Sequence, residues 1–537
     1  MFKGFRQIAF LTVISRVFGM VRDMVFSHFF GLSGMMDIWA IAFMIPNLSR
    51  RIFGEGAAAS SLIPVYSEAL KKDKAYSLDL ARTVVTVIFV MLAVIVIAGE
   101  IGIWLYCKNY DPIPNTRRML LLVAIMLPYM CLICTVAILA GLLNSHRHFA
   151  MPAAAPIVLN LIIISVLCIS GWGFKIVPEK QVFLLAVGVL FAGMVQLVMQ
   201  IVPLTRHGIV LRPAWHVQTE AFRKIMFLMG PMILGLTVTQ LNTLADGVIA
   251  KWLSASDQKG ETLLWLGREV AYPARQGAVA SLYFAQRLYQ FPLGVLGISL
   301  ATAIFPILSA AAADKDENLL RQTIQRGFAA AIFVALPATI GLFLVSRPLT
   351  AILYQHGQFG HEDTRQVQMV LIFYSLGLCA YFLQQLVIRA FYSMKDSKWP
   401  ARTAMIAVAV NIVLNLTLIW PLGVSGLALS TAICSYLQVL ILLAILSRKF
   451  KFTISKNVLS LSAKTIVATA VMAGAGWGTQ KLMSGLASHK TGDLLQVVTL
   501  VAVCSGVYII VSRRLGNPML SLLFGARKKP KITLKAP

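Results

Sequence analysis

Apolar residues occur along this chain in long runs that short polar segments interrupt. About fourteen runs approach the 20 residues that an α-helix needs to cross a bilayer. They lie at residues 6–30, 36–65, 83–106, 118–143, 153–173, 182–204, 223–252, 279–311, 327–353, 367–393, 401–420, 423–446, 460–483 and 494–513. The pattern predicts an all-α polytopic membrane protein with about 14 transmembrane helices.

Composition agrees with this interpretation, because 58% of the 537 residues are hydrophobic and only 13% are charged. Soluble domains are less apolar and carry about twice that share of charge. The seven cysteines lie mostly in apolar runs, and Cys131 and Cys134 have zinc-like spacing but no His or Cys partners nearby. They are therefore expected to be inert, membrane-buried thiols, and no cofactor is expected.

Positive charge is concentrated in particular loops. The chain has 48 Lys and Arg against 21 Asp and Glu, a formal net charge of +27, and basic clusters at 71–74, 447–452 and 526–535 fall on one predicted side. Basic loops remain cytoplasmic, so both termini are expected on the cytoplasmic side of the membrane. Anionic lipids are expected partners, whereas nucleic acid is not, because no reading module is present.

A segment of mixed charge, residues 254–278, is the longest predicted loop. It is expected on the outer side as a short amphipathic helix lying on the membrane, with a solvated loop as the alternative.

Two loops resemble one another. "GLLNSHRHFAMPAA" (141–154) and "AFYSMKDSKWPART" (390–403) each place a serine seven residues before a proline. Six runs separate them, which indicates two duplicated six-helix lobes with two helices appended; chance similarity is the alternative. The expected parts are 1–206 (N-terminal lobe, helices 1–6), 207–450 (C-terminal lobe, helices 7–12), 451–515 (helices 13–14) and 516–537 (basic cytoplasmic tail).

Several charged residues interrupt the apolar runs, although each ionised group at the bilayer centre costs about 2.5 to 3.5 kcal/mol. Pairing within helices, such as Arg16 with Asp23 or Arg51 with Glu55, is one explanation. The first, second and eighth runs nevertheless hold five arginines and three acids: Arg16, Arg22, Arg50, Arg51, Arg287, Asp23, Asp37 and Glu55. The surplus predicts an intramembrane anion site, since guanidinium binds phosphate oxygens bidentately.

These residues resemble the MviN/MurJ family of lipid II flippases, in the multidrug/oligosaccharidyl-lipid/polysaccharide exporter superfamily. The resemblance covers essentially the whole chain. It rests on "SRVFGMVRD" (15–23), "MDIWAIAFMIPNLSRRIFGEGA" (36–57), "GLLNSHRHFAMPAAAPIVLN" (141–160) and "LYFAQRLYQFPLGVLGISLATAIFPILS" (282–309).

The resemblance implies two pseudo-symmetric lobes around a cationic cavity for the lipid II headgroup, with a groove formed with helices 13 and 14 for the polyprenyl tail. It implies cavity roles for Arg16, Arg22, Arg50 and Arg287, with Asp37 and Glu55 as acids; the charge argument adds Arg51 to this substrate-binding set. Two departures are Met44, where the family often has a basic residue, and Gln286, where it commonly has an acid.

Some relatives hold sodium between spans 7, 11 and 12. Asp246, Asn411, Asn415 and Thr431 fall at similar places, and their oxygens suit a hard cation. Interhelical hydrogen bonding and protonation of Asp246 are the alternatives. Coupling to sodium or protons and to the membrane potential is therefore expected.

The predicted function is alternating-access flipping of undecaprenyl-diphosphate-linked lipid II, with lipid II and cell-wall synthesis proteins as partners and no enzymatic chemistry. An exporter of another polyprenyl-diphosphate-linked glycan or of an amphipathic drug is the nearest alternative. A membrane enzyme would need a catalytic cluster that is not found, and a non-transporting scaffold would not need the surplus arginines.

Overall fold

The computed structural model describes residues 2–53, 59–206, 208–265, 267–450, 452–483 and 490–523. It divides into two compact units. The first contains residues 1–284, 353–366 and 408–427, and the second contains residues 285–352, 367–407 and 428–537. Helices α9, α11, α12, α14 and α15 therefore contribute residues to both units, so neither unit is one continuous stretch of chain.

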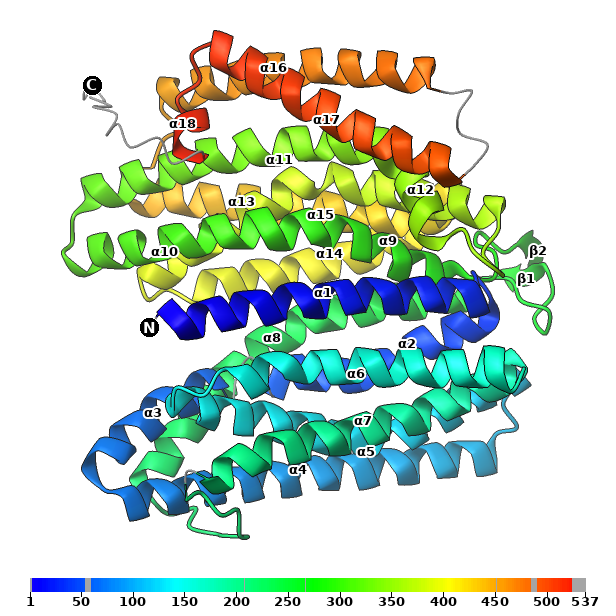
Figure 1. Cartoon of the computed structure of the whole chain (residues 1–537), viewed down its shortest axis with the longest axis vertical. Helices are drawn as coiled ribbons and strands as arrows, with labels where there is room; N and C mark the ends of the chain where they lie inside the picture. The colour runs from blue at the N-terminus through cyan, green and yellow to red at the C-terminus, as the bar shows by residue number, and fades with distance from the viewer. Residues whose placement is uncertain are drawn as a thin grey trace. The chain divides into compact units, whose positions relative to one another are not determined.

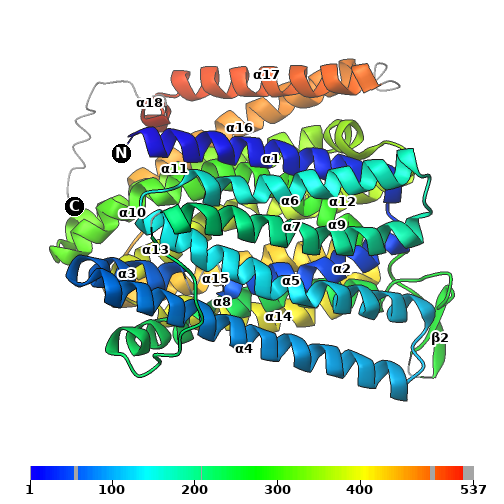
Figure 2. The ribbon, with the colours of Figure 1, turned by 60° about the horizontal axis from the view of Figure 1, so that its bottom comes forward.

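The first unit is built mainly from helices of the N-terminal half. These are α1 (Phe2–Phe30), α2 (Gly34–Ser49), α3 (Ala59–Lys72), α4 (Lys74–Asn109), α5 (Pro114–Ser145), α6 (Ala150–Cys168) continued by the π-helical turn η2 (Ile169–Gly173), α7 (Pro178–Arg206) and α8 (Glu220–Trp252). Helix α5 packs against α2, α3, α4 and α7, and α6 lies between α1 and α7. Figure 2 shows α6, α7, α5 and α4 in successive rows.

The second unit contains most of the remaining helices. These are α9 (Ala278–Pro292) with the π-helical turn η3 (Leu293–Gly297), α10 (Ile298–Ala313), α11 (Glu317–Tyr354), α12 (His361–Leu376), α13 (Leu378–Ser393), α14 (Lys398–Leu422), α15 (Val424–Phe450), α16 (Lys456–Leu482), α17 (Lys490–Arg514) and α18 (Met519–Leu523). One buried apolar cluster joins α10, α11, α13 and α15 through Leu308, Ile324, Phe391 and Leu442. Helices α16 and α17 lie side by side (Figure 1).

The predicted all-α polytopic membrane fold is confirmed. Among the described residues, ten helices are long and apolar enough to cross a membrane, and α12 with α13 forms an eleventh candidate that bends by 43°. The predicted run 36–65 differs in one respect: α2 ends at Ser49, residues 50–53 form a π-helical turn, and α3 begins separately at Ala59. Pro46 inside α2 removes a backbone hydrogen bond just before this change.

The segment 254–278 contains a β-hairpin, so the expected amphipathic helix is wrong. Strands β1 (Thr262–Trp265) and β2 (Arg268–Ala271) pair antiparallel, with Thr262 opposite Ala271 and Trp265 opposite Arg268. Gly260 and Gly267 have φ angles of 76° and 79°. Glycines in this left-handed region favour turns and interrupt a helix.

The two similar loops adopt the same turn. After α5, Arg147 has φ 60° and His148 N donates to Leu143 O; after α13, Lys395 has φ 59° and Asp396 N donates to Phe391 O. Asp316 N donates to Ala311 O in the same way beside Lys315, at φ 54°. Since a third helix end shares this geometry, the turn is a general helix termination, and the duplicated lobes stay a prediction.

Candidate functional site

Arg22 and Asp23 form a buried ion pair on α1. Their relative exposures are 8% and 3%, and Arg22 Nη2 lies 2.7 Å from Asp23 Oδ1. Tyr283 on α9 donates its hydroxyl hydrogen to the same carboxylate oxygen at 2.8 Å and accepts from Arg22 Nη2 at 3.1 Å. Asp23 therefore neutralises Arg22 within the α1 helix, whereas the structure does not bring Asp23 to Arg16, as one interpretation of the sequence had it.

Asn160 on α6 holds the other edge of the guanidinium. Its Oδ1 accepts from Arg22 Nη1 at 3.0 Å, while its Nδ2 donates to the Ser15 carbonyl at 3.3 Å. Because Asn160 is 5% exposed, these bonds form away from water and fix the guanidinium plane. The Arg22 network consists of Arg22, Asp23, Asn160 and Tyr283, and it presents a preorganised cation inside the first unit.

The other predicted arginines of the first unit are more accessible. Arg16 is exposed on α1. Arg50 and Arg51 are half-buried in the π-helical turn after α2, where Arg50 Nη2 donates to Asn47 Oδ1 at 2.9 Å and Arg51 Nη1 to Gln240 Oε1 at 3.4 Å. In these contacts both guanidinium groups are held by neutral amide oxygens.

The remaining members of the predicted anion site lie elsewhere. Glu55 falls outside the described residues. Arg287 lies on the part of α9 that belongs to the second unit and is half-buried there. Its neighbour Gln286 donates from Nε2 to the Tyr374 hydroxyl at 3.1 Å. A neutral amide thus takes a structural hydrogen bond at the position where the resemblance had led us to look for an acid.

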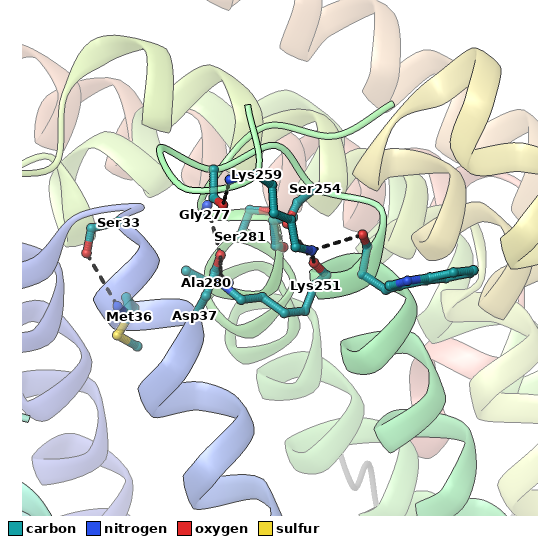
Figure 3. Close-up of polar contacts among 12 residues, drawn as sticks. Ser33, Met36, Asp37, Lys251, Ser254, Lys259, Gly277, Ala280 and Ser281 are labelled. Atoms are coloured by element: carbon teal, nitrogen blue, oxygen red, sulfur yellow. Dashed lines mark hydrogen bonds and ion pairs between the residues drawn. The ribbon is translucent and has the colours of Figure 1, made fainter. Parts of the chain in front are cut away.

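Asp37 connects α2 to the start of α9 (Figure 3). The carboxylate is fully buried and accepts from Gly277 N at 3.0 Å and from Ala280 N at 2.8 Å. Gly277 directly precedes α9 and Ala280 lies in its first turn, where backbone donors lack helical partners. Lys251 Nζ lies 3.7 Å from Asp37 Oδ2 and supplies a compensating charge. Asp37 therefore caps another helix rather than offering a free acid.

Gly277 makes this junction possible. Its φ is +86°, and a Cβ built there would lie 2.2 Å from the Leu32 carbonyl oxygen, in the turn between α1 and α2. The backbone of the turn therefore touches the backbone that precedes α9. We name the contact of Leu32 and Asp37 with Gly277 and Ala280 the α2–α9 junction.

Three of the four residues predicted to hold sodium come together. Asn415 Nδ2 on α14 donates to Asp246 Oδ1 on α8 at 2.6 Å and to Asn411 Oδ1 at 2.8 Å, and all three side chains are at most 3% exposed. Thr431 belongs to the second unit. The donor set of one carboxylate and two amides suits a hard monovalent cation. In the described arrangement the Asn415 amide nitrogen contacts both oxygens, so a cation there would compete with that amide for them.

Four contributing residues were not singled out from the sequence: Asn160, Tyr283, Lys251 and Gln240. Asn160 and Tyr283 lie inside the segments that carry the family resemblance, so that signal was present. Lys251 follows a long apolar stretch near the end of α8, a position typical of a snorkelling loop lysine. Only packing reveals that it faces a buried carboxylate.

The chain resembles known proteins over almost its whole length. A family model described as "Lipid II flippase MurJ" matches residues 26–498. The "Probable lipid II flippase MurJ" of Rhizobium meliloti is 31% identical over 538 residues, which cover 97% of this chain and 95% of that protein.

Solved structures share the fold. A structure titled "Lipid II flippase MurJ, inward closed conformation" aligns with a TM-score of 0.72 at 24% identity, covering 95% of this chain and 99% of that one. An inward-facing multidrug resistance MATE family transporter of the MOP superfamily aligns with a TM-score of 0.61 at 11% identity, covering 81% and 94%.

Proposed function

Because this chain belongs to the family of the lipid II flippase MurJ, we propose that it moves lipid II from the inner to the outer leaflet of the cytoplasmic membrane. The observation that carries this proposal is the buried, preorganised Arg22 network in a membrane protein. An arginine held in one orientation by Asp23 and Asn160 is suited to a diphosphate, whose oxygens match the guanidinium fork. Flipping changes no covalent bond, so the chain is a transporter and not an enzyme.

The proposed binding set is Arg16, Arg22, Arg50, Arg51 and Arg287, with Asp37 and Glu55 as acidic members. The cationic groups would attract the diphosphate from the cytoplasmic side, and Arg22 would exchange contacts with Asp23 for contacts with phosphate oxygens. The α2–α9 junction would close the outer side until the headgroup leaves. Alternating access between inward-open and outward-open states accounts for transport.

The proposed topology has fourteen spans with both termini in the cytoplasm. Besides the ten helices and the bent pair, it takes α1, α2 and α8 as spans. These three are not among the ten apolar helices of membrane length: α2 has only 16 residues, and α1 and α8 contain charged residues. Residues 1–206 and 207–450 would form the lobes.

Helices α16 and α17, within 451–515, expose Leu459 and Trp477 and would hold the polyprenyl tail. The basic tail 516–537, described only to residue 523, would contact anionic lipid.

The membrane potential would assist transport. Moving two negative charges outward across an inside-negative membrane is favourable by about 4 to 5 kcal/mol per 100 mV. A sodium ion or proton at Asp246, Asn411 and Asn415, with Thr431, would help return the empty carrier. Cell-wall synthesis proteins are the proposed protein partners.

The first test measures lipid II flipping in proteoliposomes. Substituting Arg22→Gln together with Asp23→Asn removes the cation without leaving a buried unpaired charge, which alone would cost about 3 to 5 kcal/mol. Flipping should fall at least about tenfold, since each charge-assisted hydrogen bond contributes about 1.5 to 3 kcal/mol. Arg287→Gln should behave similarly.

The matched control is Arg347→Gln, an exposed arginine of α11 outside the proposed site, which should flip like wild type. Thermal unfolding confirms that each variant folds. Folded double variants with wild-type flipping would remove Arg22 from the mechanism, and absence of flipping by the wild-type protein would redirect the proposal to another polyprenyl-diphosphate or amphipathic cargo.

Sodium binding is tested separately from transport. The melting temperature of the wild-type protein should be higher in sodium chloride than in choline chloride, because a ligand that binds only the folded state stabilises it. Asp246→Asn and Asn415→Leu should abolish this difference, whereas Asp314→Asn, in the loop after α10, should keep it. Equal wild-type melting temperatures in both salts would reject sodium and leave the proton as the coupling ion.

A further inference from the structure

A cavity of about 250 Å³ lies beside α2, where the start of α5 meets the end of α8 in the first unit. Its walls come from Ile41 of α2, the start of α5, the end of α8 and the segment that follows α8. The α5 contribution includes Asn115 and Thr116 in the first helical turn. The cavity therefore lies at one end of the membrane-spanning helices and is separate from the Arg22 network.

Both charged residues that line this cavity are lysines, Lys251 and Lys259. Lys259 Nζ donates to the carbonyl oxygens of Lys251 and Trp252 at 3.1 and 3.2 Å, at the C-terminal end of α8 (Figure 3). These bonds use two of the three N–H donors of the ammonium. Burial, and then the positive charge of Lys251, lower the pKa of Lys259 below its usual value. An anion between the two lysines would relieve this repulsion.

The rest of the lining is mainly apolar and continues onto the lipid-facing surface. Ile113, Val248 and Trp252 line the cavity and are 40%, 51% and 58% exposed. Trp104, near the end of α4, and Tyr110, directly after that helix, are 59% and 65% exposed. Exposed Trp and Tyr at helix ends are typical of the level of the lipid headgroups. A ligand here would meet two ammonium groups and an apolar wall open to the bilayer.

We propose that this cavity binds the phosphate of an acidic phospholipid such as phosphatidylglycerol, with the acyl chains along Val248 and Trp252. The ammonium groups of Lys251 and Lys259 contact the phosphate, and the first turn of α5 supplies Thr116. The Asn115 N–H already donates to Gln258 Oε1 at 2.9 Å, and Pro114 has no N–H to offer. Charge complementarity and the continuous apolar wall favour a lipid over a free anion. The outer leaflet follows from the topology proposed above, whereas binding itself does not depend on the proposed function.

Binding at this site would affect the α2–α9 junction. Lys251 lies in the cavity and also 3.7 Å from Asp37 Oδ2. A phosphate competes with Asp37 for Lys251 and leaves the buried carboxylate with less compensating charge. Acidic phospholipid therefore loosens the contact of Asp37 with the first turn of α9 and favours opening at this junction.

The test uses the purified full-length protein without lipid II, so its outcome is independent of flipping. Native mass spectrometry measures binding of phosphatidylglycerol and of phosphatidylcholine as lipid is titrated. Phosphatidylglycerol should bind wild type at least about tenfold more tightly, and Lys259→Gln should remove that preference, since one charge-assisted contact corresponds to about a factor of ten. Lys108→Gln is the matched control: this lysine lies over the Trp104 ring and outside the cavity.

Lys259 also caps α8, so Lys259→Gln removes that cap as well as the cation. A second variant therefore distinguishes loss of the binding site from misfolding. Thr116→Glu places a carboxylate in the cavity, retains both lysines and should likewise abolish the preference. Amide exchange at residues 277–281 should become faster with phosphatidylglycerol than with phosphatidylcholine. Unchanged binding in both variants, equal binding of the two lipids, or displacement of the lipid by millimolar inorganic phosphate would overturn the proposal.

Discussion

At the scale of single residues, the charged groups within the membrane helices are held by partners of different kinds. Arg22 is paired with an acid, Arg50 and Arg51 contact amide oxygens, and Asp37 caps a helix. These differences assign different roles to residues that look alike in the sequence. Arg50 and Arg51 are held in those contacts by neutral amide oxygens, whereas Arg22 is oriented and neutralised by Asp23. Under the proposed function, the diphosphate would take the place of Asp23.

Tyr283 is the residue that we expect to position Arg22. Tyr283→Phe removes the hydroxyl that bonds both Asp23 and Arg22, at a cost of about 1 kcal/mol in the free energy of unfolding. Flipping should fall about threefold to tenfold while the protein still folds. Tyr76→Phe, at an exposed tyrosine near the start of α4, serves as the control in the same proteoliposome assay. A wild-type rate for Tyr283→Phe would show that Asp23 and Asn160 orient Arg22 without it.

At the scale of secondary-structure elements, turns and breaks decide where polar groups meet. The turn between α1 and α2 touches the backbone before α9, which lets Asp37 reach amides that α9 cannot satisfy itself. After α2 the regular α-helix similarly gives way to a π-helical turn that holds Arg50 and Arg51. Such interruptions are tolerated in a membrane protein where they are packed against protein or line a polar space.

Gly277→Ala should destabilise the α2–α9 junction. A methyl group there would lie 2.2 Å from the Leu32 carbonyl oxygen at a φ of +86°, so both the conformation and the packing are unfavourable. Gly267→Ala separates these effects, because Gly267 has φ +79° and nothing within 4 Å of a built Cβ.

The control should lose about 1 to 2 kcal/mol, and Gly277→Ala at least about 2 kcal/mol more because of the clash. Thermal unfolding in detergent compares them. Equal losses in the two variants would mean that the junction can move apart without cost.

At the scale of the whole molecule, the chain forms two compact units that are not continuous in sequence. Residues 353–366 and 408–427 belong with the N-terminal unit, so late segments complete a structure that early segments begin. Asp246 and Asn415 illustrate this, because their hydrogen bond joins α8 to α14 across 169 positions. The β-hairpin and the loop between α10 and α11 offer exposed positions at which the proposed topology can be tested.

The topology predicts opposite accessibility for two exposed positions. In a variant whose native cysteines are replaced, Leu264→Cys in the β-hairpin, 77% exposed in wild type, should react with a membrane-impermeant maleimide in intact cells. Lys315→Cys, in the loop between α10 and α11, should react only after the membrane is permeabilised. The reverse pattern would place both termini outside, since spans alternate in direction.

The sequence by itself determined the membrane helices, the basic loops and the surplus of arginine, because the length of an apolar run and the cost of buried charge are local properties. Predicted and observed helix ends agree within a few residues for most of the runs; the β-hairpin at 262–271 depended instead on strand pairing. Only the tertiary structure decided which groups meet. Arg22 bonds Asn160 across 138 positions, and Asp37 bonds Gly277 across 240. Such contacts depend on how helices pack, and neither hydropathy nor helical periodicity specifies that packing.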